Sequence, residues 1–181
     1  MNYTKLEIPE IIVLKPKSFQ DARGSFSEIY RESFLSEITG DKISFVQDNK
    51  SISFKNVIRG LHYQLSPDEQ GKLISVSRGK IFDVAVDVRK KSLTLGKYVS
   101  KILSEENKEQ IWIPPGFAHG FLALDDHTEI TYKCTNYYSP NNERTINWSD
   151  DTININWPII GNPIVSEKDN LAKNINEIEL F

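Results

Sequence analysis

Cysteine is almost absent from this chain. Cys134 is the only one among 181 residues, so no intramolecular disulfide can form, and no cysteine spacing typical of a metal site exists. The first residues, Met1–Glu7, lack the apolar run of a signal peptide, and no later run is as long as a membrane helix requires. These absences predict a protein of the reducing cytoplasm that does not enter a membrane.

A basic stripe is also missing. The chain has 22 Lys and Arg against 25 Asp and Glu, a formal net charge of −3, and its lysines do not cluster. Because proteins that grip nucleic acid present clustered basic residues, we exclude nucleic acid as a partner. An anionic ligand would need local cations such as Arg23 and Arg59, which each adjoin a glycine. Their guanidinium groups suit phosphate, but pairing with surface acids explains each one equally well.

Histidine is scarce. The chain has three, His62, His119 and His127, and no His-x-His pair, whereas metal sites in β-barrels typically add a carboxylate and a further histidine to such a pair. We therefore expect no metal, although three separate histidines could still converge as ligands. His127 follows Asp126 in a polar segment and is expected to face water.

The chain does have several short segments in which apolar residues occupy every second position. With 39% apolar and 26% charged residues it resembles an ordinary globular protein, and residues 1–181 are predicted to form one domain. Short alternating segments at regular spacing, separated by turn residues, favour an all-β antiparallel jelly roll. Arg78-Gly79 predicts a hairpin between two of them. The clearest predicted strands are 73–77, 80–88, 98–103, 110–113, 119–124 and 129–136.

Helical signals are few and short. Residues 32–39 predict a helix that Gly40 ends in the left-handed conformation. Ser166 followed by Asp169 three residues later has the pattern of a capping box, which predicts a second helix. We expect small peripheral helices, and a loosely held tail after Leu171.

Two stretches place a histidine beside glycine, namely Arg59–Gln64 (RGLHYQ) and Pro114–Phe121 (PPGFAHGF). Glycine inside a strand usually marks a bulge or a close approach to a ligand. Imidazole titrates near ~6.5 and can accept a proton at neutral pH, but an ordinary hydrogen-bonded histidine remains the alternative at each site. Arg59 and His62 are three residues apart, so a regular strand would point them to opposite faces. We predict that a bulge at Gly60 brings both into one pocket.

Three further residues could take part in acid–base chemistry. Tyr132 shares a strand face with Ile130 and Cys134, and its phenol could deliver a proton or simply pack. Lys72 follows Gly71 at the start of a strand, where a solvated lysine is common. Asp169 is already explained as the acid of the capping box. None of these residues is decisive alone.

Together these segments resemble the dTDP-4-dehydrorhamnose 3,5-epimerase family, also called dTDP-4-keto-6-deoxyglucose 3,5-epimerases. The similarity runs in order through nearly the whole chain, and its motifs are specific as a set. The matching stretches are FQDARG (19–24), FVQDN (45–49), NVIRGLHYQ (56–64), QGKL (70–73), GKIFDVAVD (79–87), WIPPGFAHGF (112–121), YKCTNYY (132–138) and SEKD (166–169).

The resemblance implies a cupin-type jelly roll, or double-stranded β-helix, that needs neither metal nor organic cofactor. It implies a homodimer whose subunits exchange N-terminal segments. The family's reaction inverts C3 and C5 of dTDP-4-dehydro-6-deoxy-D-glucose to give dTDP-4-dehydro-L-rhamnose, in L-rhamnose biosynthesis. Both carbons adjoin the C4 ketone, so their protons become removable when an enolate is stabilised.

The family's pattern also assigns roles to residues of this chain. His62 would be the base, Asp169 would orient it, Lys72 would stabilise the enolate oxygen, and Tyr132 would return a proton. Tyr138 would stack on the thymine, and Arg23 and Glu28 would contact ligand from the neighbouring subunit. The remaining implied contacts to the sugar nucleotide are Gln47, Asp48, Asn49, Arg59, His119, Glu143 and Lys168.

Three alternatives stay open on the sequence. A relative on the same scaffold could epimerise only C3 or C5, or act on another nucleotide. A metal-dependent cupin oxygenase or isomerase is a second alternative, and a non-catalytic sugar-binding jelly roll is a third, because fold alone does not imply function.

Overall fold

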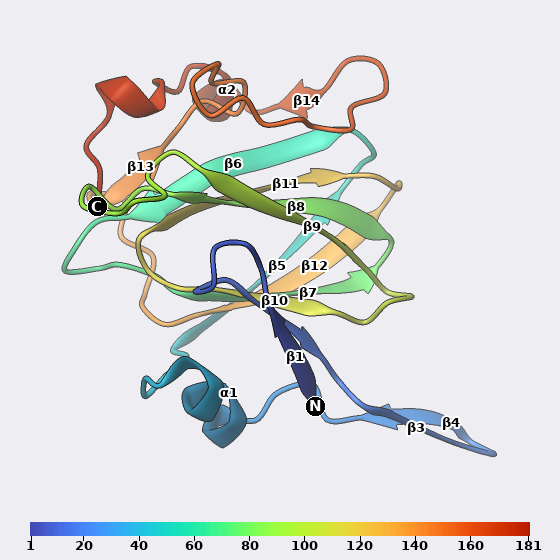
Figure 1. The fold of residues 1–181 in the computed structure, drawn as a ribbon. Helices are drawn as coiled ribbons and strands as arrows, with labels where there is room; N and C mark the ends of the chain where they lie inside the picture. Colours follow the sequence, from blue (N-terminus) through green and yellow to red (C-terminus); the bar gives the residue numbers. More distant parts are fainter.

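Two antiparallel sheets face each other in the computed structural model, which describes residues 1–181 (Figure 1). The first sheet has the strand order β1 (Asn2–Lys5), β2 (Ile12–Lys15), β10 (Gln110–Ile113), β7 (Lys72–Arg78), β12 (Thr128–Cys134) and β5 (Gln47–Ser53). The second has the order β13 (Glu143–Thr145), β6 (Val57–Gln64), β11 (Phe117–Ala123), β8 (Lys80–Asp87) and β9 (Tyr98–Ser104), and β14 (Ile164–Val165) pairs parallel to β6. The prediction of an all-β antiparallel jelly roll is confirmed.

The strands alternate between two buried environments. In β7, Ile74 and Val76 face the other sheet, whereas Leu73 faces outward into a cluster beneath helix α1 (Glu32–Thr39). The α1 prediction is confirmed, including its end at Gly40, which adopts a φ of 81°. No helix in the chain has the length and apolar character that crossing a membrane would need.

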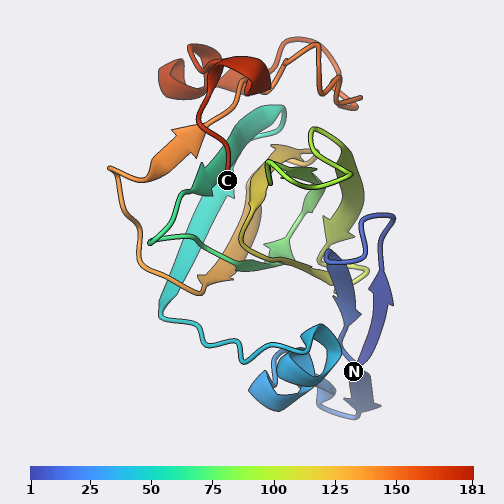
Figure 2. The same cartoon turned by 60° about the vertical axis from the view of Figure 1, so that its left-hand side comes forward.

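The outer face of the second sheet is covered by the C-terminal part of the chain, which lies across β6 and β8 in both ribbon views (Figures 1 and 2). The expected loose tail is wrong. Ile175, in the short helix η1 (Ile175–Glu177), is buried against this sheet. The Tyr63 hydroxyl donates to the Glu179 carbonyl, and the Phe181 amide donates to the carbonyl of Val88 at 3.0 Å. These apolar and backbone contacts hold the tail in place.

The predicted hairpin at Arg78-Gly79 is also wrong. Strands β7 and β8 follow each other in the sequence but lie in opposite sheets. Gly79, with a φ of 76°, instead turns the chain from one sheet to the other. The period of two identifies both strands, but it does not specify the partner of either.

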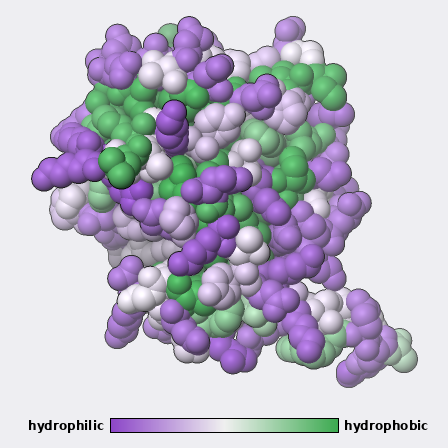
Figure 3. Space-filling view, viewed as in Figure 1, coloured by the Kyte–Doolittle hydropathy of each residue, from purple (hydrophilic) through white to green (hydrophobic).

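A two-stranded arm, β3 (Ser18–Asp21) with β4 (Gly24–Ser27), stands clear of the sheets (Figure 1). Phe19 and Phe26 on this arm are 53% and 71% exposed. Figure 3 shows hydrophobic atoms on the protruding arm at the lower right. Large apolar side chains in such a position are typical of a surface that another molecule covers.

Candidate active site

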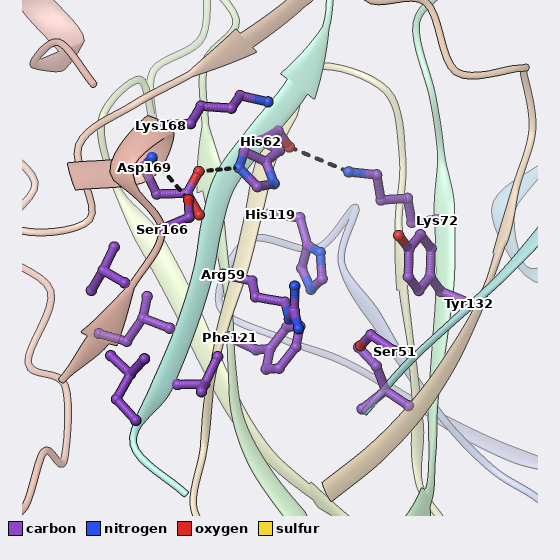
Figure 4. Close-up of a pocket in the computed structure, with 15 residues that line it drawn as sticks. Ser51, Arg59, His62, Lys72, His119, Phe121, Tyr132, Ser166, Lys168 and Asp169 are labelled. Carbon is purple, nitrogen blue, oxygen red and sulfur yellow. Dashed lines mark hydrogen bonds and ion pairs between the residues drawn. The ribbon is translucent and has the colours of Figure 1, made fainter. Parts of the chain in front are cut away.

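A cavity of about 480 Å³ opens between the two sheets (Figure 4). One wall comes from β6 and β11, the opposite wall from β5, β7 and β12, and β14 with the following helix α2 (Glu167–Asn170) closes one side. All four residues predicted for catalysis, His62, Lys72, Tyr132 and Asp169, lie in its lining. Three of the ten residues predicted for binding, Arg59, His119 and Lys168, also line it.

His62 and Asp169 form a hydrogen-bonded pair although they are far apart in the sequence. His62 Nε2 lies 2.7 Å from Asp169 Oδ1, and the Gly60 amide donates to Asp169 Oδ2 at 3.2 Å. Burial would raise the pKa of Asp169, but the hydrogen bond and charge of His62, together with the hydrogen bonds from Gly60 and Ser166, outweigh it, so the pKa lies below its ordinary value of 3.8. An ionised carboxylate only accepts, so Nε2 carries the hydrogen and Nδ1 is left free to take a proton.

Helix α2 places that carboxylate. The Ser166 hydroxyl accepts from the Asp169 amide at 3.1 Å, so Ser166 caps the helix as predicted. The Asp169 side chain does not return to the backbone of Ser166, as a full capping box requires. It points to His62 instead, with the side chain of Asp169 5% exposed and that of His62 30% exposed. The histidine is thus open to the cavity, whereas its partner, which also lines the cavity, is almost fully buried.

The predicted bulge at Gly60 is confirmed. His62 pairs with His119 across the sheet and Arg59 pairs with Phe121, so three steps along β6 match two along β11. Gly60 has a φ of 125°, and a Cβ there would lie 2.5 Å from Gly120 Cα. Only glycine fits this crossing, and the extra residue brings Arg59 and His62 to the same cavity.

Lys72 and Tyr132 stand across the cavity from His62 (Figure 4). The Lys72 ammonium donates to the carbonyl of His62 at 3.3 Å, and burial lowers its pKa against the opposing effect of Cys134, Glu143 and Asp83. Burial likewise raises the pKa of Tyr132. A phenol with a raised pKa stays protonated at neutral pH and is able to donate.

His119 belongs to a second histidine–aspartate pair. Its Nε2 lies 2.8 Å from Asp83 Oδ2, and the two side chains are 9% and 0% exposed. Asp83 is a neighbour of the site to which the sequence assigned no role, although it lies in the matching stretch 79–87. His127 lies in an exposed turn, as expected, and no group of three or more His, Cys, Asp or Glu is arranged around a metal-sized position.

Arg59 reaches the cavity with no acidic partner. Its Nε donates to the Ser53 hydroxyl at 3.1 Å, and its Nη2 approaches the Ile52 carbonyl at 3.5 Å. Because neither contact neutralises the guanidinium, its charge is available to an anionic ligand.

A second hollow of about 240 Å³ shares His62, Lys72 and Tyr132 with the first. At its rim the Tyr138 hydroxyl donates to Glu143 Oε2 at 2.9 Å, and Lys168 donates to the same oxygen at 2.5 Å. Burial would raise the pKa of Glu143, but these bonds lower it overall. Gln47 and Asn49 line this hollow from β5, so five predicted binding residues gather at one end of the site.

Three predicted contacts lie elsewhere. Asp48 alternates to the outward face of β5, where its carboxylate accepts from Lys133 at 2.9 Å, so its side chain does not enter the cavity. Arg23 is on the exposed arm, bound to Asp21 at 2.6 Å. Glu28 follows the arm and pairs with Arg31 at 2.8 Å. Within this chain neither Arg23 nor Glu28 lines the cavity.

The apolar part of the cavity was not identified from the sequence. Strand β14 is two residues long and pairs with the start of β6, too short for a period to be visible. The apolar residues that line the cavity are Val57, Ile58, Phe121, Ile130, Ile164 and Val165.

Comparisons with known proteins agree with this architecture. The sequence model of the dTDP-4-dehydrorhamnose 3,5-epimerase family matches residues 5–177. The protein of that name from Shigella flexneri is 54% identical over 169 residues, covering 93% of each chain. The structure of a dTDP-6-deoxy-D-glucose-3,5-epimerase from Legionella pneumophila in complex with dTDP-4-keto-L-rhamnose has a TM-score of 0.94 at 47% identity, covering 98% of this chain and 94% of that one.

A more distant structure is also similar. A 3'-monoepimerase from Streptomyces bikiniensis in complex with dTDP-quinovose has a TM-score of 0.90 at 29% identity, covering 95% of this chain and 87% of the other. Relatives that cover nearly the whole chain are named epimerases, so the protein is an enzyme of the isomerase class. The chain belongs to the dTDP-4-dehydrorhamnose 3,5-epimerase family.

Proposed function

We propose that the protein inverts both C3 and C5 of dTDP-4-dehydro-6-deoxy-D-glucose, giving dTDP-4-dehydro-L-rhamnose. The observation that carries the proposal is the placement of His62 with Asp169 on one wall of the cavity, facing Lys72 and Tyr132 on the other. Side chains thus supply a base, a cation and an acid, and the reaction as proposed needs no cofactor. The product-like ligand named for the Legionella relative supports this substrate class.

His62 removes the proton. The C3–H bond breaks, the proton moves to Nδ1, and the electron pair forms a C3–C4 double bond with the negative charge on the C4 oxygen. Asp169 fixes the ring through Nε2 and stabilises the imidazolium that forms. Because Asp169 is almost fully buried, its charge acts on His62 with little screening by water.

Lys72 and Tyr132 complete the step. One N–H of the Lys72 ammonium is bound to the His62 carbonyl, which leaves two for the enolate oxygen. Tyr132 then gives its proton to the opposite face of C3, and the enolate pair forms the new C–H bond. Inversion requires removal on one face and delivery on the other, which a single histidine cannot provide. His62 then releases its proton to water and Tyr132 takes one up, and the same sequence at C5 completes the reaction.

The nucleotide fits the second hollow in this proposal. Tyr138 offers a half-exposed ring for stacking on the base, held by its bond to Glu143. Lys168, which is bound to Glu143 beside that ring, and Arg59, which has no acidic partner, supply positive charge to the cavity for the diphosphate. Gln47 and Asn49 supply amide groups to the base edge.

The arm of β3 and β4 supports a homodimer with exchanged N-terminal segments. Arg23 near its tip has a side chain that is 90% exposed, and Phe26 is exposed beside it. If the arm lies over the site of a second copy, Arg23 and Glu28 reach the ligand there. The exposed side chains of Phe19 and Phe26 on the arm then become covered. Each site would then need residues from two chains.

Mixing two inactive variants tests this shared site. Arg23→Ala and His62→Asn each remove one component of a site, and a one-to-one mixture that exchanges subunits forms half mixed dimers. Each mixed dimer has one intact site, so activity should return to roughly a quarter of the wild-type value. No recovery after confirmed subunit exchange would show that Arg23 acts within its own chain or not at all.

Turnover of dTDP-4-dehydro-6-deoxy-D-glucose in deuterated water tests the reaction itself. Deuterium at both C3 and C5 is the expected result. Deuterium at C3 alone would select a monoepimerase, an activity named for the similar Streptomyces bikiniensis protein. No incorporation would reject this substrate and favour a binding protein or a different ligand.

A further inference from the structure

Strand β5 presents a row of polar side chains to the site, and one of them has no partner. Its inward residues alternate as Gln47, Asn49, Ser51 and Ser53. Gln47 and Asn49 are hydrogen-bonded to each other at 3.0 Å, and Ser53 accepts from Arg59 at 3.1 Å. The Ser51 hydroxyl oxygen is buried and makes no hydrogen bond.

The position of Ser51 makes this exception informative. Four other buried side-chain atoms lack a partner, on Ser18, Glu69, Asp83 and Gln110, and none of those residues lines the cavity. Ser51 does line it, and Figure 4 shows it beside Tyr132, on the wall opposite His62. A buried hydroxyl without a partner is costly, so buried polar groups are nearly always paired. A ligand in this cavity would supply the missing partner.

We propose that Ser51 is a substrate-positioning residue that hydrogen-bonds a hydroxyl of the hexose. The inference rests on the proposed function, which limits the candidates. In a 4-keto-6-deoxy hexose attached to a diphosphate, C1 carries the phosphate, C4 the ketone and C6 a methyl group. Only the hydroxyls at C2 and C3 remain. A serine hydroxyl both donates and accepts, so it can pair with either.

This contact would hold the ring close to Tyr132. Ser51 faces Ile130 across the β5–β12 pair, and Asn49 faces Tyr132 in the same register. A sugar hydroxyl bound to Ser51 is therefore anchored two residues along β5 from Asn49, the residue that faces Tyr132. Such an anchor limits rotation of the ring between the base and the acid, which favours reaction at the correct carbon.

Three substrates separate positioning from a structural role. The rate of deuterium incorporation at C5 is measured for the parent sugar nucleotide and for its 2-deoxy and 3-deoxy analogues, with wild type and Ser51→Ala. We expect Ser51→Ala to lower kcat/KM on the parent by about five- to tenfold, the size of one neutral hydrogen bond. On one of the two analogues the variant and wild type should have the same kcat/KM, which identifies the hydroxyl.

Two variants serve as controls. Ser77→Ala removes an exposed serine on β7, which lies in the same sheet on the other side of β12, and should leave all three rates unchanged. Ser51→Cys keeps the size of the side chain with a weaker donor and should fall between wild type and Ser51→Ala. An equal loss on all three substrates, or no loss on the parent, would overturn the role of Ser51. Failure of wild type on the parent would instead reject the proposed function.

Discussion

Two histidine–aspartate pairs occur at the same cavity, and they differ in access and in origin. His62 and Asp169 join β6 to a helix near the end of the chain, and the histidine is 30% exposed. His119 and Asp83 lie on adjacent strands of one sheet, and the histidine is 9% exposed. The distances from histidine Nε2 to the aspartate oxygen are nearly equal, at 2.7 and 2.8 Å.

The difference shows that a histidine–aspartate pair alone does not define a base. Asp169 has both oxygens bound, one by His62 and one by the Gly60 amide. Asp83 leaves Oδ1 unpaired and fully buried. The first pair is fully hydrogen-bonded at its carboxylate and open at its imidazole, which suits repeated proton transfer. The second is enclosed, which suits a fixed donor or acceptor in the wall.

Removing the open imidazole should have the largest effect. His62→Asn is expected to lower kcat by about 10³-fold, since it deletes the base, while leaving the fold intact. The matched control is His127→Asn, in an exposed turn with a φ of 51° that asparagine tolerates. Steady-state kinetics on both variants measure the comparison, and a loss below tenfold for His62→Asn would show that another group is the base.

Neutralising the partner of that imidazole should have the next largest effect. Asp169→Asn keeps the shape but loses the charge that stabilises the imidazolium, and we expect kcat to fall by roughly 10²-fold with a smaller change in KM. Asp151→Asn, at an exposed position, is the control. Unchanged kcat in Asp169→Asn would remove the aspartate from the mechanism.

The same change in the enclosed pair should have a much smaller effect on turnover. Asp83→Asn keeps an acceptor for His119, so we expect kcat to fall less than about tenfold and the free energy of unfolding to fall by about 1 kcal/mol. Kinetics and denaturant unfolding measure the two quantities. A loss of kcat as large as in Asp169→Asn would mean that the two pairs are equivalent.

The pH dependence of stability should show the smallest effect. The pKa of Asp169 is below its ordinary 3.8 because the hydrogen bond from His62 and other contacts outweigh burial. Its contribution to stability is therefore fully present above pH 3.8 and is lost as the pH falls through the folded-state pKa. The difference in unfolding free energy between wild type and Asp169→Asn should shrink below pH 3.8. A difference that grows on acidification would contradict this sign.

The sequence predicts the local features of this molecule well. The period of two in residues 80–88, the left-handed Gly40 and the bulge at Gly60 each follow from short-range chemistry, and each is found in the structure. The prediction of a hairpin at Arg78-Gly79 is wrong because the pairing of a strand depends on which sheet it joins. The local sequence around a turn does not specify that sheet.

The site shows the same limit. His62 and Asp169 are 107 residues apart in the sequence. The capping-box pattern already explains an acid at position 169, so it gives no sign of the hydrogen bond to His62. Family resemblance, not periodicity, brought the two together. Asp83 lies in the matching stretch 79–87 but had no role assigned to it, and Ser51 lies in no matching stretch. The structure identifies Asp83 by its hydrogen bond to a histidine and Ser51 by its lack of any partner.

Tyr132→Phe in deuterated water tests the central claim most directly, because it separates proton removal from proton return. If His62 removes the protons and Tyr132 returns them from the other face, this variant should still exchange C3 and C5 hydrogens for deuterium, returned from the original face, while epimer formation falls by about 10²-fold or more. Epimer formation at the wild-type rate, or exchange that persists in His62→Asn, would contradict the account.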